Sequence, residues 1–250
     1  MSNIECKGLQ SVRKRGKYIM TGKPLTDYEK YIRTEELLSL QKEGTELSCD
    51  DELTFQMVHQ IAELHFKLIL QYIDLADKFM REKEVVKATN QLQRINMHVK
   101  HLPAVFSMTK VISPMDYHTI RLALGRGSGQ DSPGFNAILK MGPTLWAPFE
   151  SLLKEHLLTP LELHKQASKQ PELFNLMQEL TYFDENFQTF RHNHIQLVRR
   201  MIGLNTKSLK GVPAQMLERG AKFEFYPQLW QAICDLTDFT GSSYNPKPLD

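Results

Sequence analysis

The stretch FQTFRHNHIQLVRRMIG, residues 187–203, decides the fold because its apolar residues recur at steps of three and four. On a helix this spacing brings them to one face. The residues on that face are Phe187, Phe190, His194, Leu197 and Met201. His194 therefore stands inside a stripe that a helix buries. Two interpretations are open at this point: a core histidine whose ring nitrogens bond to neighbouring groups, or a ligand of a metal or cofactor.

The whole chain repeats this helical periodicity. Long amphipathic segments alternate with short proline and glycine stretches, and no segment shows the sustained alternation of a half-buried strand. We predict an all-α fold: one helical-bundle domain over residues 25–240 with long central helices, between a flexible basic arm (1–24) and a C-terminal tail (241–250). Helices are expected over residues 26–38, 50–81, 84–107, 114–124, 133–141, 148–168 and up to Gly203, with further starts at Pro213 and Pro227.

The helix expected over residues 50–81 has apolar residues on two faces. One stripe contains Leu53, Met57, Ile61, Leu64 and Leu68, and the other contains Phe55, His59, Ala62, Phe66 and Ile69. A helix that is apolar on most of its circumference is typical of the centre of a bundle, so we expect this one to be buried there. His59 repeats the question raised by His194.

Composition excludes several classes of protein. The 250 residues include 31 basic and 29 acidic side chains, and the net charge of +2 does not favour nucleic acid or an anionic membrane as the main partner. Three scattered cysteines, without a C-x-x-C pair, indicate a reducing compartment. No apolar run has the ~18–20 residues of a membrane span, and the N-terminus lacks a signal-peptide core. We expect a cytoplasmic protein.

The sequence lacks the residue spacings that most histidine-containing catalytic and metal sites require. A di-iron bundle needs Glu-x-x-His on two helices, and the sequence contains none. The His-Glu-x-x-His zinc motif, the Gly-x-Ser-x-Gly elbow and a phosphate-binding glycine loop after a strand are also absent. Haem iron, by contrast, needs only one axial ligand in an apolar pocket. His194 is a candidate for that ligand, and His59 with Phe55 is a candidate for the pocket on the opposite side of the haem. The core-histidine interpretation stays open.

Several segments together resemble the tryptophan 2,3-dioxygenase family. They are FQMVHQIAELHFK (55–67), ISPMDYHTIRLALGRGSGQDSPGF (112–135), the opening stretch (187–203) and FYPQLW (225–230), and they occur in the family's order and approximate spacing. LTDYEKYIRTEELLSLQ (25–41) resembles the start of the family's sequences. The resemblance covers most of the chain from about residue 25 to 237.

The resemblance implies a haem b-dependent dioxygenase of tryptophan catabolism, in the kynurenine pathway. Such an enzyme inserts O2 into the indole C2–C3 bond of L-tryptophan, or a close analogue, to give N-formylkynurenine. His194 matches the axial iron ligand, and His59 matches the distal histidine that hydrogen-bonds the substrate ring nitrogen. Arg121 matches the residue that binds the substrate carboxylate, a role suited to the two parallel hydrogen bonds of a guanidinium. Phe55 and Tyr117 match aromatic walls of the substrate pocket.

Further positions follow from the same resemblance. Ser128 matches a serine at the edge of the haem and the substrate, and Phe190 lies on the proximal side of the haem. Ser208 takes the place of the family's threonine that holds the substrate ammonium. Tyr28 and Tyr31 match aromatic residues that reach into the active site of a neighbouring subunit. The resemblance therefore also implies a homo-oligomer, a tetramer built as a pair of dimers.

The chain departs from the family pattern at a few positions. Leu209 and Lys210 replace small residues in the loop after the proximal helix, and Phe190 and His65 stand where the family has tryptophan. Two alternatives to tryptophan dioxygenation are therefore open. One is a specialised relative that adds one oxygen to another aromatic amino acid, such as tyrosine or a substituted tryptophan. The other is a helical haem-binding protein without catalytic activity.

Overall fold

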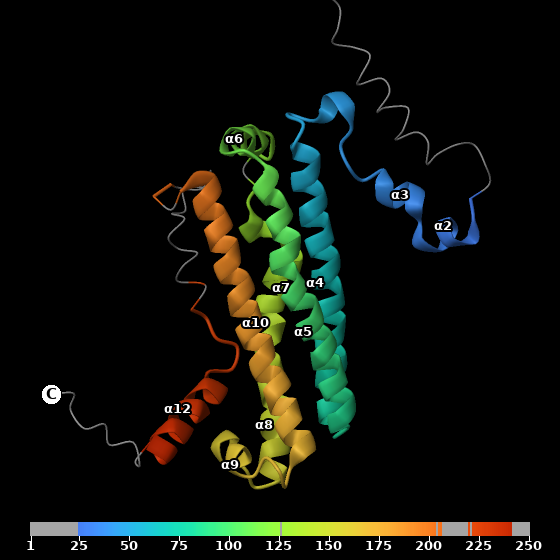
Figure 1. Ribbon diagram of the computed structural model, residues 1–250. Helices are drawn as coiled ribbons and strands as arrows, with labels where there is room; N and C mark the ends of the chain where they lie inside the picture. The colour runs from blue at the N-terminus through green and yellow to red at the C-terminus, as the bar shows by residue number, and fades with distance from the viewer. Residues whose placement is uncertain (1–24, 126, 204, 207–219, 221, 242–250) are drawn as a thin grey trace, which may run out of the picture.

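The computed structural model describes residues 25–125, 127–203, 205–206, 220 and 222–241, and this part of the chain is all-α, as predicted (Figure 1). The expected arm, most of the expected tail, Pro213 and Ser208 lie outside the described residues. The α-helices are α2 (Asp27–Ile32), α3 (Thr34–Leu38), α4 (Glu52–Arg81), α5 (Val85–Ser107), α6 (Pro114–Ala123), α7 (Pro133–Met141), α8 (Trp146–Glu155), α9 (Pro160–Lys165), α10 (Pro171–Ile202) and α12 (Pro227–Gly241). The 3-10 helices are η2 (Gly44–Glu46), η3 (Met108–Val111), η4 (Gly129–Asp131) and η5 (Gly142–Leu145).

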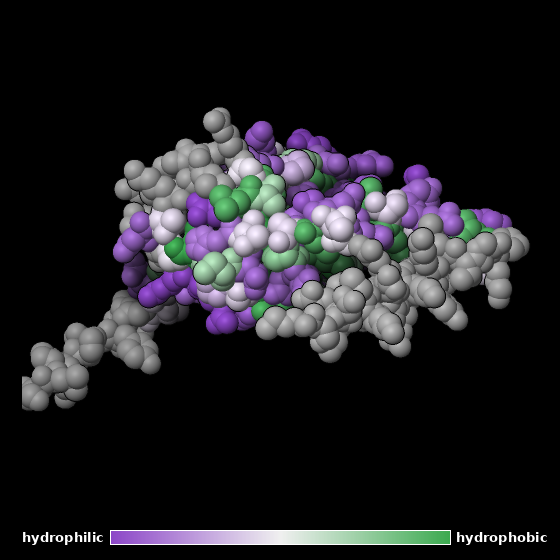
Figure 2. Space-filling view, turned by 90° about the horizontal axis from the view of Figure 1, so that it is seen from above, coloured by the Kyte–Doolittle hydropathy of each residue, from purple (hydrophilic) through white to green (hydrophobic). Residues whose placement is uncertain are grey.

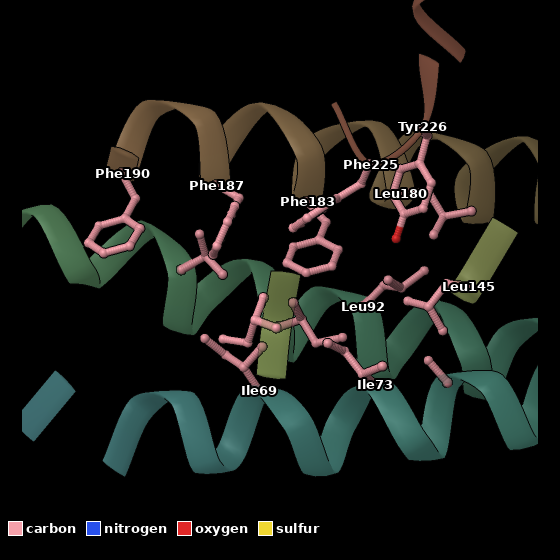
Figure 3. Close-up of a cluster of buried hydrophobic side chains, with 14 of the residues drawn as sticks. Ile69, Ile73, Leu92, Leu145, Leu180, Phe183, Phe187, Phe190, Phe225 and Tyr226 are labelled. Carbon is pink, nitrogen blue, oxygen red and sulfur yellow. The ribbon is translucent and has the colours of Figure 1, made fainter. Parts of the chain in front are cut away.

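Three long helices, α4, α5 and α10, form the body of the bundle (Figure 1). Helix α5 packs against both α4 and α10, and α7, η5 and α8 pack against α4. The core between them is apolar and rich in phenylalanine. In Figure 3 the aromatic side chains of α10 project toward α5 and α4. The core residues labelled there include Ile69, Ile73, Leu92, Phe183, Phe187 and Phe190.

The opening stretch lies in the second half of α10 and has the predicted buried face. Phe187, Phe190, Leu197 and Met201 are all buried. The helix ends where expected, because Gly203 adopts a positive φ of 71° and its N–H donates to the Arg199 carbonyl. The periodicity therefore identified both the face of this helix and its end.

Two of the predicted helices are each interrupted. The helix expected over residues 26–38 breaks at Arg33, which adopts φ 55° and closes α2 by donating its N–H to the Glu29 carbonyl. The helix expected over 148–168 breaks at Leu157, which also has φ 55°, and α9 restarts with Thr159 as its N-cap and Pro160 in its first turn. Both interruptions place a left-handed residue that is not glycine, which apolar periodicity does not reveal.

The helix expected over residues 50–81 was predicted to be buried in the centre of the bundle, and in the single chain this is wrong for one of its two apolar stripes. One stripe of α4 is buried, with Val58, Ala62, Phe66 and Ile69 in the core. The other stays at the surface, with Met57, Leu64 and Leu68 exposed at 40%, 52% and 38%. Since α5 and α7 pack on the first stripe, the second lies on the opposite side of the helix.

Helices α2 and α3 contain no buried residue and project from the bundle (Figure 1). Tyr28 and Tyr31 are exposed at 71% and 88%. Figure 2 views the molecule from the α6 end, where hydrophobic residues form small patches between hydrophilic ones. Among the described helices, none is both long enough and apolar enough to cross a membrane.

A buried carboxylate joins α12 to α10. Asp184 is 1% exposed, and its Oδ2 accepts hydrogen bonds from the Tyr226 backbone N–H (2.9 Å) and the Trp230 Nε1–H (3.0 Å). Its Oδ1 accepts from the Gln188 side chain at 3.1 Å. The Tyr226 hydroxyl donates to the Gly142 carbonyl at 2.8 Å. These bonds fix the start of α12 beside the phenylalanines of α10.

Candidate active site

His59 and His194, predicted from separate helices, line the same cavity. The cavity has a volume of about 430 Å³ and lies between α4, α5, α7 and α10. Its size is within the range of sites for cofactors and small molecules. Most of its wall is apolar, and the apolar lining residues include Phe66, Phe106, Phe135, Leu139, Phe190 and Ile195.

His194 is held by aromatic rings and has no hydrogen-bond partner among the described residues. Its ring centroid lies 5.4 Å from that of Phe106 and 6.4 Å from that of Phe190. Burial, with a smaller effect of the nearby His59, lowers the pKa of His194 to about 4. The imidazole is therefore neutral at pH 7, the form that binds metal ions.

His59 is fixed in one tautomer by the turn of α4 that precedes it. Its Nδ1 lies 2.7 Å from the Phe55 carbonyl oxygen, and since that oxygen only accepts, Nδ1 carries the proton. Burial lowers the pKa of His59, against smaller opposing effects of the Phe55 carbonyl and Glu63. Neutral His59 is left with Nε2 as a hydrogen-bond acceptor. The Phe106 ring contacts both histidines, with centroids 5.4 Å from each.

A second cavity of about 780 Å³ adjoins the first and contains further predicted residues. Phe55, His59 and Ser128 line it. The Phe55 ring lies 4.1 Å from the His59 ring and 6.0 Å from the Tyr117 ring, between centroids, so Tyr117 supports this wall from α6. The two cavities share the lining residues His59, Glu63, Gly129 and Ser132.

Other predicted residues lie outside these walls. Arg121 is partly buried on α6, one turn after Tyr117, and is not among the residues that line either cavity. Tyr28 and Tyr31 lie on the exposed α2, away from both cavities in this chain. Ser208 lies outside the described residues. The structure thus brings together the two histidines, Phe55, Tyr117, Ser128 and Phe190.

Glu63 is a site residue that the sequence interpretation missed. It lines both cavities, and its carboxylate accepts hydrogen bonds from the Ser132 hydroxyl and, at 3.2 Å, from the Gly134 N–H. The contact is tight, since a Cβ on Gly134 would lie 2.6 Å from Phe66 Cβ. Glu63 therefore ties the loop that carries Ser128 to α4. Its position, one helical turn after His59, is the signal that identifies it.

The residues of the first cavity fit a haem. Two neutral imidazoles line it inside apolar aromatic walls, and one of them, His194, has no hydrogen-bond partner among the described residues. Partly buried Arg191 lies on the same wall and supplies positive charge for an anionic group. Gly129 lies over the imidazole, where a Cβ would be 3.9 Å from Nε2 of His194.

The fold and the site define a helical-bundle protein with two neutral histidines in an apolar, cofactor-sized pocket. Residues 16–142 match the family model described as tryptophan 2,3-dioxygenase, and the chain belongs to this family. This confirms the resemblance found in the sequence and the predicted class of enzyme, a dioxygenase.

Bacterial relatives with the same description match this chain along nearly their whole length. Tryptophan 2,3-dioxygenase from Saccharopolyspora erythraea is 27% identical, covering 81% of this chain and 90% of the relative. The protein of that name from Herpetosiphon aurantiacus is 26% identical, covering 84% of this chain and 98% of the relative. The one from Caulobacter vibrioides is 27% identical, covering 81% and 95%.

Proposed function

We propose that this protein is a haem-dependent oxygenase that inserts both atoms of O2 into the indole C2–C3 bond of L-tryptophan or a close analogue, giving N-formylkynurenine. Family membership supports the reaction. The observation that carries it for this chain is the tautomer of His59. An indole N–H is a hydrogen-bond donor and needs an acceptor. The Nε2 atom of His59, which lines the second cavity, is such an acceptor.

His194 would hold the haem iron, Phe190 would contact the cofactor, and Ser128 would lie near it from the adjoining second cavity. Bound haem would supply the redox chemistry that makes dioxygen reactive. The low pKa of His194 keeps its imidazole neutral, with one ring nitrogen free of a proton to bind iron, well below neutral pH. Phenylalanine rings around it exclude water from the reacting region.

The substrate is proposed to lie in the second cavity. Phe55 is its aromatic wall, supported from behind by Tyr117, and His59 orients the indole by accepting its N–H. Arg121 would bind the substrate carboxylate and Ser208 the ammonium. An L-amino acid with a large aromatic side chain is the substrate class that these proposed roles would suit.

A homotetramer is proposed as the working form of the enzyme. Helices α2 and α3 project from the bundle without a single buried residue. Tyr28 and Tyr31 on α2 expose large apolar rings, which suits residues that complete the active site of a neighbouring subunit. Gel filtration with light scattering, comparing the full chain with Tyr28→Ser/Tyr31→Ser, measures whether these side chains hold subunits together.

Mass spectrometry tests the reaction directly. Haem-loaded protein is incubated with L-tryptophan and ascorbate under ¹⁸O2, and the product is expected to carry two labelled oxygens. A gain of one labelled oxygen would assign the chain to hydroxylation instead. An unchanged substrate pool, together with a haem absorption band, would make it a haem-binding protein without this activity.

Replacement of Arg121 by alanine is expected to raise KM for the amino acid about ten- to hundredfold with unchanged haem content. The reason is the loss of charge-assisted hydrogen bonds to the carboxylate, about 1.5–3 kcal/mol each. Arg121→Lys is the matched control and should give a smaller rise, because lysine keeps the charge without the paired donors. Saturation kinetics that match the wild type in both variants would contradict the role.

Replacement of Glu63 by glutamine is expected to move the acid limb of the pH profile of kcat/KM to lower pH. The Glu63 carboxylate raises the pKa of His59 against the stronger effect of burial, so removal of its charge lowers that pKa further. Since neutral His59 is the acceptor, activity is lost as the pH falls through this pKa. Glu162→Gln, on the exposed side of α9, is the control, and an acid limb that stays in place or rises would disprove the coupling.

A further inference from the structure

Two histidines away from both cavities face each other across α4 and α5. The Nδ1 atoms of His65 and His98 are 3.0 Å apart, with ring centroids at 5.1 Å and ring planes at 72°. His98 also stacks on Tyr72, with centroids 5.9 Å apart and planes at 23°. Neither histidine lines the two cavities. The proposed oxygenase reaction leaves this pair without a role.

We propose that His65 and His98 form a binding site for a divalent transition-metal ion, with Cu²⁺ bound most tightly. Two imidazole nitrogens on one ion, at metal–nitrogen distances of about 2.0–2.1 Å, are about 2.9 Å apart at a right angle and about 3.3 Å apart at a tetrahedral angle. The two nitrogens now lie 3.0 Å apart, the length of an N–H···N hydrogen bond, and this is close to the spacing that one ion requires. Among the divalent first-row ions, Cu²⁺ stands highest in affinity for imidazole.

The protonation of the pair suits this role. Burial lowers the pKa of both His65 and His98, with further lowering by the charge of neighbouring histidines, so both are neutral at pH 7. One Nδ1 now donates to the other, and a bound ion replaces that shared proton once the donor ring carries its proton on Nε2. Each ring must also turn about its Cβ–Cγ bond, so that the two lone pairs no longer face each other but meet at one point.

Water completes the coordination of this site. Within the described residues, no three His, Cys, Asp or Glu side chains are arranged to hold a metal ion. His101, one turn along α5 from His98, is exposed, and its Nδ1 is engaged by the Met97 carbonyl at 2.6 Å. The pair is partly exposed at the surface of the bundle, so that water and the ion both have access.

A bound ion would link the two helices that carry much of the active site. His65 lies six residues after His59 on α4, and His98 lies eight residues before Phe106 on α5. An ion that binds only the folded pair stabilises the protein by mass action. We therefore expect the thermal midpoint to rise with Cu²⁺ concentration.

Copper titration of the haem-loaded full chain tests the site. Isothermal calorimetry and the electron paramagnetic resonance of Cu²⁺ are expected to show one equivalent bound with nitrogen ligands. His65→Gln and His98→Gln should each weaken that binding at least tenfold and abolish the rise in thermal midpoint. Unchanged circular dichroism and haem absorption show that the variants remain folded.

Two further variants make the result decisive. His164→Gln removes a single partly buried histidine that packs on Phe174 of α10, and it should bind Cu²⁺ as the wild type does. His101→Gln should retain the affinity within threefold. Equal Cu²⁺ affinity in the wild type, His65→Gln and His98→Gln would overturn the proposal, and so would a loss in His101→Gln as large as in His65→Gln. None of these outcomes depends on oxygenase activity.

Discussion

Replacement of His194 by alanine is expected to abolish stable haem binding. His59, the other described histidine of the first cavity, is assigned to the substrate side, where its Nε2 accepts the indole N–H. Loss of the proposed iron ligand would remove the coordinate bond that fixes the cofactor in the pocket. The absorption spectrum and the haem-to-protein ratio after gel filtration measure the effect.

A neighbouring histidine provides the control for this experiment. His192→Ala removes an exposed side chain two residues away on α10 and should leave haem content at the wild-type ratio. A His194→Ala protein that keeps a normal ferrous-haem spectrum at full occupancy would refute the assignment of the ligand. Restoration of haem binding by added imidazole would support it, because the small molecule takes the position of the missing ring.

Replacement of Asp184 by alanine is expected to lower the free energy of unfolding by about 2–5 kcal/mol. The change leaves the buried Tyr226 N–H and the partly buried Trp230 indole N–H without their acceptor, and each orphaned group costs about 1–3 kcal/mol. Urea unfolding followed by circular dichroism measures the loss. Because these bonds fix the start of α12, we also expect the N-terminus of that helix to exchange amide hydrogens faster.

Two control variants distinguish the loss of these hydrogen bonds from a general destabilisation of α10. Glu185→Ala changes the next residue, which is exposed, and should alter stability by no more than about 0.5 kcal/mol. Asp184→Asn keeps one acceptor oxygen and should lie between Asp184→Ala and the wild type. A loss below about 1 kcal/mol in Asp184→Ala would show that the carboxylate is dispensable for holding α12.

Periodicity predicted the long helices because their stability comes from burying one continuous face. It gave the buried stripe of α10 and its end at Gly203, but not the breaks at Arg33 and Leu157. A single left-handed residue changes one pair of backbone angles and leaves the spacing of apolar residues intact. The exposed stripe on α4 was missed for a different reason, since apolar character does not say whether the same chain covers it.

The site was predicted in part. His59 and His194 share a cavity as expected, because a histidine within an apolar stripe is conspicuous in the sequence. Arg121 and Ser208 stay predictions. Glu63 had only its spacing from His59 as a signal, and Asp184 had none, since their hydrogen-bond partners lie 71 and 42 residues away and polar pairs of that separation follow no local pattern.

The wall shared by the two cavities couples ligand binding in one cavity to ligand binding in the other. His59, Glu63, Gly129 and Ser132 face both spaces, so a molecule on one side rests on the same side chains as a molecule on the other. Any shift of these side chains that tightens one compartment changes the affinity of its neighbour, and by reciprocity the influence is equal in both directions. The shared wall therefore couples the two cavities thermodynamically. A molecule bound in the first cavity changes the affinity of the second cavity for its own ligand.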